Sequence, residues 1–165
     1  MNAKLPEYPD ITRHNTFPKL LAYNAANWPD EVALREKEFG IWNEFTWRDY
    51  ETAVAQFALG LRTLGVGKGD VVGIIGGNRP EWVQCEIAAH ALGALSLGIY
   101  QDSLAEEVRY LISYADVKVV MCEDEEQADK VLEVVNDCPS VQYIIYHDPR
   151  GMRKYHDRRL ISQEE

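Results

Sequence analysis

The stretch Val71-Val72-Gly73-Ile74-Ile75-Gly76-Gly77-Asn78-Arg79-Pro80-Glu81-Trp82 decides the fold. It opens with an apolar run up to Ile75, continues through a glycine pair and a proline, and passes into a helical pattern that lasts to about Leu92. Apolar runs without polar alternation are typical of strands covered on both faces. The stretch therefore predicts a buried strand, a tight turn and a helix.

The same order of elements repeats downstream. Ser103 and Glu106 match a capping box, and Asp124 matches the cap of a helix with an acidic first turn. Further apolar runs occur at Leu95–Tyr100, Val117–Cys122 and Val141–Tyr146. Apolar runs separated by helices indicate βαβ units, and right-handed crossovers arrange such units as a doubly wound sheet. The predicted fold class is α/β, with a mainly parallel sheet of about four strands.

The residues before this repeat predict a smaller substructure. A polar, proline-punctuated lead-in reaches Asp30, and Val32–Thr46 reads as a β-hairpin. Thr46 and Asp49 resemble a capping box with Asp in place of Glu, and the following apolar residues recur at helical spacing as far as Leu64. The sequence therefore predicts a hairpin followed by an amphipathic helix.

On these patterns the chain has three parts. Residues 1–69 form the lead-in, hairpin and helix, residues 70–146 form the βαβ doubly wound subdomain, and residues 147–165 form a polar connector. The last residues resemble a helix that has just begun, with Ser162 as its cap. Since natural chains seldom stop inside a cap, we expect the sequence to be truncated.

Composition excludes several classes of function. The 165 residues include 17 Lys and Arg against 27 Asp and Glu, and the net charge of -10 argues against a nucleic-acid partner. No apolar run is long enough to span a bilayer, and Met1–Pro9 lacks the apolar segment of a secretory signal. The 3 cysteines form no CxxC pair, so we expect no disulfide framework and a cytoplasmic location.

Ligands of doubly wound sheets bind beyond the carboxyl ends of the strands, and three segments fall there. Gly76–Arg79 lacks the spacing of a known phosphate-binding loop, so a tight turn is favoured over a phosphate site. Glu123-Asp124 reads as a solvated helix start. Tyr100 and Gln101 are the candidate substrate-binding residues, because a ring and an amide suit an uncharged tail or a thiol arm. The alternative is a tyrosine that only closes the edge of the core.

The sequence predicts no catalytic residue and no metal site. Neither histidine nor cysteine shows metal-ligand spacing, and the histidines lie in unrelated contexts (His14, His90, His147 and His156). Cys85 and Trp82 read as core residues of one helix. The remaining tryptophans, Trp28, Trp42 and Trp47, are expected to cluster beneath the hairpin.

Five segments in order resemble the amino-terminal part of the adenylate-forming (AMP-binding) enzyme superfamily, particularly its long-chain fatty acid–CoA ligases. The helix start Phe45–Tyr50 is similar to the first core motif of that superfamily, and Gly67–Ile74 resembles its G-x-G-D-x-V-x-I strand. The others are Asn78–Trp82, which is similar to an N-x-P-E-W/F segment; Leu92–Val108, which resembles the second core motif; and His147–Arg153, which contains an Asp-Pro-Arg-Gly stretch.

This resemblance implies a two-step reaction, in which a fatty acid and ATP form an acyl-adenylate and the thiol of CoA then displaces AMP. The full enzyme would use ATP, CoA and Mg, whereas the family's phosphate loop and catalytic lysine have no counterpart here. The resemblance thus implies an inactive N-terminal fragment without a cofactor of its own, whose partner is the remainder of the parent chain. It places Tyr100 and Gln101 at the wall of the acyl and CoA channel.

Two further readings stay open. The chain can instead be a complete small flavodoxin-like module with a binding or regulatory role. The resemblance also allows peripheral membrane association and a homodimer formed through the segment Met1–Asn27.

Overall fold

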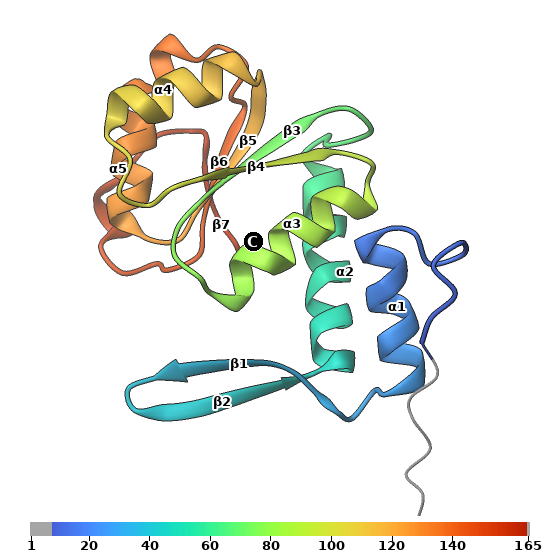
Figure 1. Cartoon of the computed structure of the whole chain (residues 1–165). Helices are drawn as coiled ribbons and strands as arrows, with labels where there is room; N and C mark the ends of the chain where they lie inside the picture. The colour runs from blue at the N-terminus through green and yellow to red at the C-terminus, as the bar shows by residue number, and fades with distance from the viewer. Residues whose placement is uncertain (1–7, 165) are drawn as a thin grey trace, which may run out of the picture. The chain divides into compact units, whose positions relative to one another are not determined.

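The computed structural model describes residues 8–164 (Figure 1). The chain forms two compact units, Met1–Thr52 and Ala53–Glu165, with the boundary inside helix α2 (Trp47–Thr63). The predicted dimer segment Met1–Asn27 lies in the first unit, and its first seven residues lie outside the described ones.

The first unit contains helix α1 (Phe17–Asn27) and the strands β1 (Val32–Glu38) and β2 (Ile41–Thr46). The two strands pair antiparallel, which confirms the predicted hairpin. Helix α1 lies within the polar lead-in, where the sequence analysis named no helix. Its start carries ordinary signals: the Thr16 hydroxyl accepts a hydrogen bond from the Lys19 N–H at 3.4 Å, and Pro18 occupies the first turn.

The start of α2 has the predicted cap. The N–H and the hydroxyl of Thr46 donate to the Asp49 carboxylate at 2.9 and 2.6 Å, and the Asp49 N–H donates to the Thr46 hydroxyl at 3.2 Å. These bonds hold the pKa of Asp49 below its ordinary value. At the other end of the helix, Gly65 adopts a φ of 81°, a conformation that favours glycine.

The second unit is built on a parallel sheet. Its strands are β3 (Val71–Ile75), β4 (Leu95–Ile99), β5 (Val117–Cys122), β6 (Tyr143–Tyr146) and β7 (Leu160–Ser162). Their order in space is β4-β3-β5-β6-β7, and every adjacent pair is parallel. The predicted doubly wound α/β fold is confirmed.

The fifth strand, β7, corrects the prediction at the end of the chain, where Ser162 was expected to cap a helix. The Ile144 N–H donates to the Arg159 carbonyl at 2.8 Å, and the Gln163 N–H donates to the Tyr146 carbonyl at 2.9 Å. The open edge of β6 carries backbone groups that need partners, and the apolar pair Leu160-Ile161 supplies them as a strand. Tertiary pairing therefore overrides the local cap signal.

Helix α3 (Pro80–Ala91) covers one face of this sheet, while α4 (Ala105–Tyr114) and α5 (Glu125–Val134) cover the other (Figure 1). The α4 and α5 side holds the main core, and the side chains of Val108, Ile112 and Ile144 within it are fully buried. Burial on this scale contributes about 1.5–3 kcal/mol for each large aliphatic side chain. Short 3-10 turns follow at Val135–Asp137 and Met152–Lys154.

Two predicted helix caps have different outcomes. The Gln127 N–H donates to the Asp124 carboxylate at 3.1 Å, so Asp124 caps α5 as predicted. The predicted box of Ser103 and Glu106 is wrong, because α4 begins one residue later and the Leu104 N–H donates to the Glu107 carboxylate at 2.9 Å. The Ser103 N–H instead closes a turn with the Tyr100 carbonyl at 3.0 Å.

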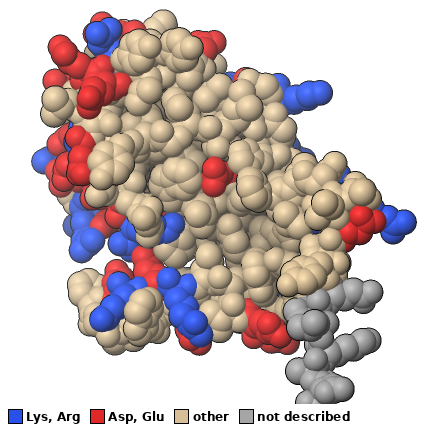
Figure 2. All heavy atoms as spheres, in the orientation of Figure 1, with Lys and Arg blue, Asp and Glu red and all other residues tan. Residues whose placement is uncertain are grey.

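Surface charge is unevenly distributed on the second unit. In Figure 2 the surface over α3 is largely uncharged, and charged side chains gather over α4 and α5. None of the helices between residues 8 and 164 combines the length and the apolar character needed to cross a membrane.

Candidate functional site

The carboxyl-terminal edge of the sheet, here called the crest, contains the topological switch point of the fold. Strand β3 connects to β4 on one side of it, whereas β5 connects onward to β6 on the other side. Chains that leave neighbouring strands in opposite directions open a crevice between them, and ligands of α/β folds bind in such crevices. The crevice between β3 and β5 is therefore the candidate ligand site of the fold.

A backbone donor and a carboxylate meet in this crevice. The Gly77 N–H, just after β3, donates to Oε2 of Glu123, just after β5, at 2.6 Å. A Cβ at Gly76 would lie 2.8 Å from the Glu123 Cβ, so only glycine leaves room for this approach. The segments after β3 and β5, two of the three that were predicted to lie at strand ends, are thus in contact. Glu123 was predicted to belong to a solvated helix start, whereas its side chain accepts a hydrogen bond from the glycine turn.

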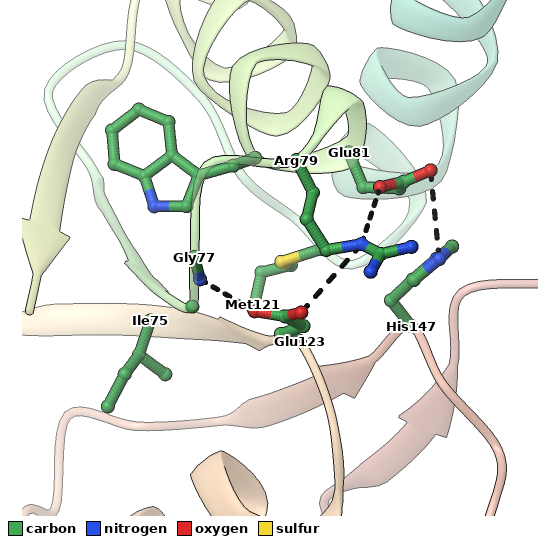
Figure 3. A pocket seen from close by; sticks show the side chains of 9 residues that line it. Ile75, Gly77, Arg79, Glu81, Met121, Glu123 and His147 are labelled. Atoms are coloured by element: carbon green, nitrogen blue, oxygen red, sulfur yellow. Dashed lines mark hydrogen bonds and ion pairs between the residues drawn. The ribbon is translucent and has the colours of Figure 1, made fainter. Parts of the chain in front are cut away.

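A row of ionisable side chains continues from Glu123 (Figure 3). Nε of Arg79 lies 3.7 Å from a carboxylate oxygen of Glu123 and 3.7 Å from one of Glu81. The other oxygen of Glu81 lies 3.7 Å from Nε2 of His147, the first residue after β6. The two contacts of Arg79 are ion pairs, and the contact between Glu81 and His147 is an ion pair when the imidazole is protonated. The row links the ends of β3, β5 and β6.

The histidine of this row is held from its other side. Nδ1 of His147 lies 2.9 Å from Oε1 of Gln163, which follows β7. An amide oxygen can only accept, so Nδ1 donates this hydrogen bond and Nε2 faces Glu81. The imidazole is thus oriented by two elements, and the row extends to the last strand of the sheet.

The crest pocket is the small space lined by Ile75, Gly76, Gly77, Arg79, Glu81, Trp82, Met121, Glu123 and His147. Its free volume is about 10 Å³, the room of a single water molecule. The carboxylate of Glu123 already accepts from the backbone donor that a phosphate would need. A second carboxylate, Glu81, faces the same guanidinium. The pocket therefore does not fit a phosphate group or a nucleotide.

The predicted binding residues Tyr100 and Gln101 lie after β4, on the far side of β3 from Glu123. Tyr100 is 71% exposed, so it is accessible to a ligand. The side-chain oxygen of Gln101 lies 2.9 Å from the position that a Cβ at Gly77 would take, so this amide packs against the glycine turn. The backbone carbonyl of Gln101 accepts from Lys130 of α5 at 2.5 Å.

The other residues singled out in the sequence are mostly structural. Cys85 is fully buried, and burial raises the pKa of its thiol, as expected of a core residue. Trp82 packs on the sheet as predicted, with a ring carbon 3.0 Å from the site of a Cβ at Gly98. Nε2 of His90 lies 3.0 Å from the Ser96 hydroxyl. Trp42 was predicted to belong to a tryptophan cluster beneath the hairpin, and this prediction is wrong because the residue is 60% exposed.

Sequence reasoning missed Glu81 and His147 as members of the crest. A signal for His147 existed, because it directly follows a predicted strand and so had to lie at a strand end. Glu81 could not be recognised, since its role depends on an imidazole that lies 66 residues further along the chain. Between residues 8 and 164, no three or more His, Cys, Asp or Glu side chains are grouped as metal ligands.

The loop after His147 is fixed by ion pairs. The Arg150 guanidinium beside Asp148 holds the pKa of that carboxyl below its ordinary value. Lys154 lies 2.6 Å from the Glu125 carboxylate and lowers its pKa in the same way. The Tyr155 hydroxyl donates to Asp129, which raises the pKa of Tyr155 to about 12. The contacts of Lys154 and Tyr155 fasten the loop to α5.

Comparison with known proteins extends this description. The family described as "AMP-binding enzyme" matches residues 21–163. Among curated proteins, the chain is 40% identical over 97 residues to the uncharacterized protein Rv1549 of Mycobacterium tuberculosis, covering 59% of this chain and 54% of that protein. It is 28% identical over 135 residues to the long-chain-fatty-acid–CoA ligase FadD15 of Mycobacterium bovis, covering 82% of this chain and 22% of the ligase.

A vertebrate relative and two solved structures agree with these matches. The chain is 32% identical over 122 residues to the long-chain-fatty-acid–CoA ligase ACSBG2 of Rattus norvegicus, covering 74% of this chain and 18% of the ligase. A coronafacic acid ligase from Pectobacterium brasiliense superposes with a TM-score of 0.78 at 18% identity, covering 89% of this chain and 28% of that one. An anthranilate CoA ligase bound to anthranoyl-AMP superposes with a TM-score of 0.73 at 22% identity, covering 78% of this chain and 24% of that one. The structures establish the shared fold, and the chain spans about a fifth of the length of the matched long-chain ligases.

Proposed function

The chain belongs to the AMP-binding enzyme family, and from this membership we propose that it is the N-terminal portion of a long-chain fatty acid–CoA ligase. The observation that carries the proposal is the match to this family over residues 21–163, together with relatives named as long-chain-fatty-acid–CoA ligases. In the proposed reaction a fatty acid and ATP form an acyl-adenylate with loss of pyrophosphate, and CoA then takes the acyl group.

Residues 8–164 act in this proposal as a scaffold. The crest pocket has room for one water, and its backbone donor is already bound to Glu123, so it does not fit the ATP phosphates. Carboxylate activation requires cations and oriented donors at the reacting phosphate, which stabilise its charge by several kcal/mol. We propose that segments of the ligase other than this chain supply those groups, including any bound Mg.

Tyr100 and Gln101 form the proposed contact with substrate, at the wall of an acyl or CoA channel. The exposed ring of Tyr100 can cover an apolar chain, and it lies on the crest where α/β folds bind ligands. A cytoplasmic location belongs to the same proposal and is supported by free, buried thiols at Cys85, Cys122 and Cys138.

The proposal is tested by incubating the purified 165-residue chain with ATP, CoA, Mg and palmitate, beside an active long-chain ligase as positive control. We expect no acyl-CoA and no pyrophosphate from the chain alone. Turnover by the chain would overturn its role as an inactive scaffold. Tight binding of a small molecule in the crest pocket would instead support the flavodoxin-like alternative.

A further inference from the structure

Lys130 connects the middle of α5 to the loop that follows β4. Its ammonium group donates to the backbone carbonyl of Gln101 at 2.5 Å, across a sequence separation of 29 residues. The Lys130 side chain is only 20% exposed, although lysines usually extend into water. A cation that is withdrawn from solvent in this way needs a full set of acceptors.

Lys130 has that set. Besides the Gln101 carbonyl, the ammonium group contacts the side-chain oxygen of Gln127 at 3.2 Å and the carboxylate of Glu126 at 3.0 Å. Two of these contacts are hydrogen bonds, to Gln101 and Gln127, and the contact with Glu126 is an ion pair. Gln127 is itself 5% exposed and belongs to the same helix. The position of the ammonium group is therefore set by α5, and the hydrogen bond from this group in turn fixes the position of the Gln101 carbonyl.

The loop held by this contact is Tyr100–Ser103, here called the crest loop. Its turn is closed by the Ser103 N–H, which donates to the Tyr100 carbonyl at 3.0 Å. The amide oxygen of Gln101 lies against Gly77, although the residue as a whole is exposed. Tyr100 beside it is 71% exposed. The loop thus holds one side chain against the glycine turn, and its neighbour extends into solvent.

We propose that Lys130 is the positioning residue of the crest loop. It fixes the backbone at Gln101, the Gln101 amide holds the loop against Gly77, and Tyr100 presents its side chain to an extended apolar chain beyond β4. The identity of that ligand rests on the proposed function, whereas the positioning by Lys130 does not.

Hydrogen exchange, measured without ligand, tests the positioning. Lys130→Met keeps the length of the side chain and removes its charge and donors. Because hydrogen bonds to charged groups are the strongest single contacts of this kind, we expect amides of residues 101–104 to exchange roughly tenfold faster or more. Amides of β3 and β5 should keep their wild-type rates. Lys130→Gln, which retains a donor without the charge, should give a smaller acceleration and also serves if the methionine variant does not fold.

Lys118 offers a matched control. Its ammonium donates to the Gly65 carbonyl at 2.7 Å and pairs with Asp70 at 2.9 Å, so it holds a different loop, before β3, in the same manner. Lys118→Met should accelerate exchange at residues 65–70 and leave residues 101–104 unchanged. Unchanged exchange at 101–104 in the Lys130 variants would overturn the positioning role, as would an equal acceleration throughout the second unit.

A second measurement concerns the ligand. Titration of the fluorescent fatty acid cis-parinaric acid into the wild-type chain and into Tyr100→Ala should show weaker binding for the variant, by about threefold or more for the loss of one aromatic contact. Binding equal to the wild type would overturn the contact by Tyr100. If none of the proteins binds the probe, the proposed substrate contact within this chain fails, while the exchange result still decides the role of Lys130.

Discussion

Replacing Glu123 should show how much the contact between Gly77 and Glu123 at the crest contributes to the free energy of unfolding. The bond from the Gly77 N–H to this carboxylate is charge-assisted, 2.6 Å long and made by a side chain that is 24% exposed. Hydrogen bonds to charged groups contribute about 1.5–3 kcal/mol, and partly exposed ion pairs such as that with Arg79 contribute about 0–1 kcal/mol. Glu123→Ala should therefore lower the free energy of unfolding by about 2 kcal/mol.

Two further variants make this expectation specific. Glu123→Gln keeps an oxygen that can accept from Gly77 and loses the charge, so it should cost about 1 kcal/mol. Glu133→Ala removes an exposed glutamate of α5 and should stay within about 0.5 kcal/mol of the wild type. Equilibrium urea unfolding followed by circular dichroism gives all three values. The reasoning is refuted if Glu123→Ala costs no more than Glu133→Ala, or if the glutamine variant is as destabilised as the alanine variant.

Other expectations follow from the loop after β6 and from the thiols. Gly151 has a φ of 81°, and an added Cβ would collide with the Glu125 carboxylate, so Gly151→Ala should lower the free energy of unfolding by about 2 kcal/mol or more in the same urea assay. Arg159 lowers the pKa of Asp157 to about 2. A carboxyl whose pKa is lowered by folding stabilises the folded state at pH values above its pKa in the unfolded chain, and this stability is lost as the pH falls from about 4 to about 2. Asp157→Asn should therefore lower the free energy of unfolding by about 1 kcal/mol at pH 7 and leave it unchanged below pH 2. An equal cost at both pH values would contradict the ion pair as the cause. Burial raises the thiol pKa of Cys85 and Cys122, so dithionitrobenzoate at pH 8 should label neither in the folded chain and should label both in guanidinium chloride.

The main sheet could be predicted because each of its first four strands is marked locally. Val71–Ile75 has no polar side chain and Val117–Cys122 has only Lys118, a pattern that is typical of strands covered on both faces. Strand β7 lacked such a mark, since Leu160–Ser162 is three residues long and is followed by a cap-like sequence. Its strand conformation arises from the unpaired edge of β6, which no local pattern reveals.

The candidate site was predictable as a place but not as a set of contacts. Strand ends mark the crest, and topology alone brings Gly77 and Glu123 to neighbouring strands. That a carboxylate would occupy the glycine turn depends on side-chain direction across 46 residues of sequence. Equally, helix α1 was overlooked although Thr16 and Pro18 form a normal helix start, because the polar residues around them obscured a short apolar face.

The closed switch point limits where a ligand can meet this part of the chain. Between β3 and β5, the Gly77 N–H is already bound to Glu123, and the free volume of about 10 Å³ is too small for more than one water molecule. An anionic ligand there would have to displace Glu123 and would still face the carboxylate of Glu81, so repulsion opposes it. On the β4 side, Tyr100 is exposed and its loop is already held in place by Lys130. A loop that is ordered before binding loses little further entropy, whereas the β3–β5 crevice would have to break its own bonds first. Apolar contact at Tyr100 is therefore favoured over phosphate contact at Gly77 within the described part of the chain.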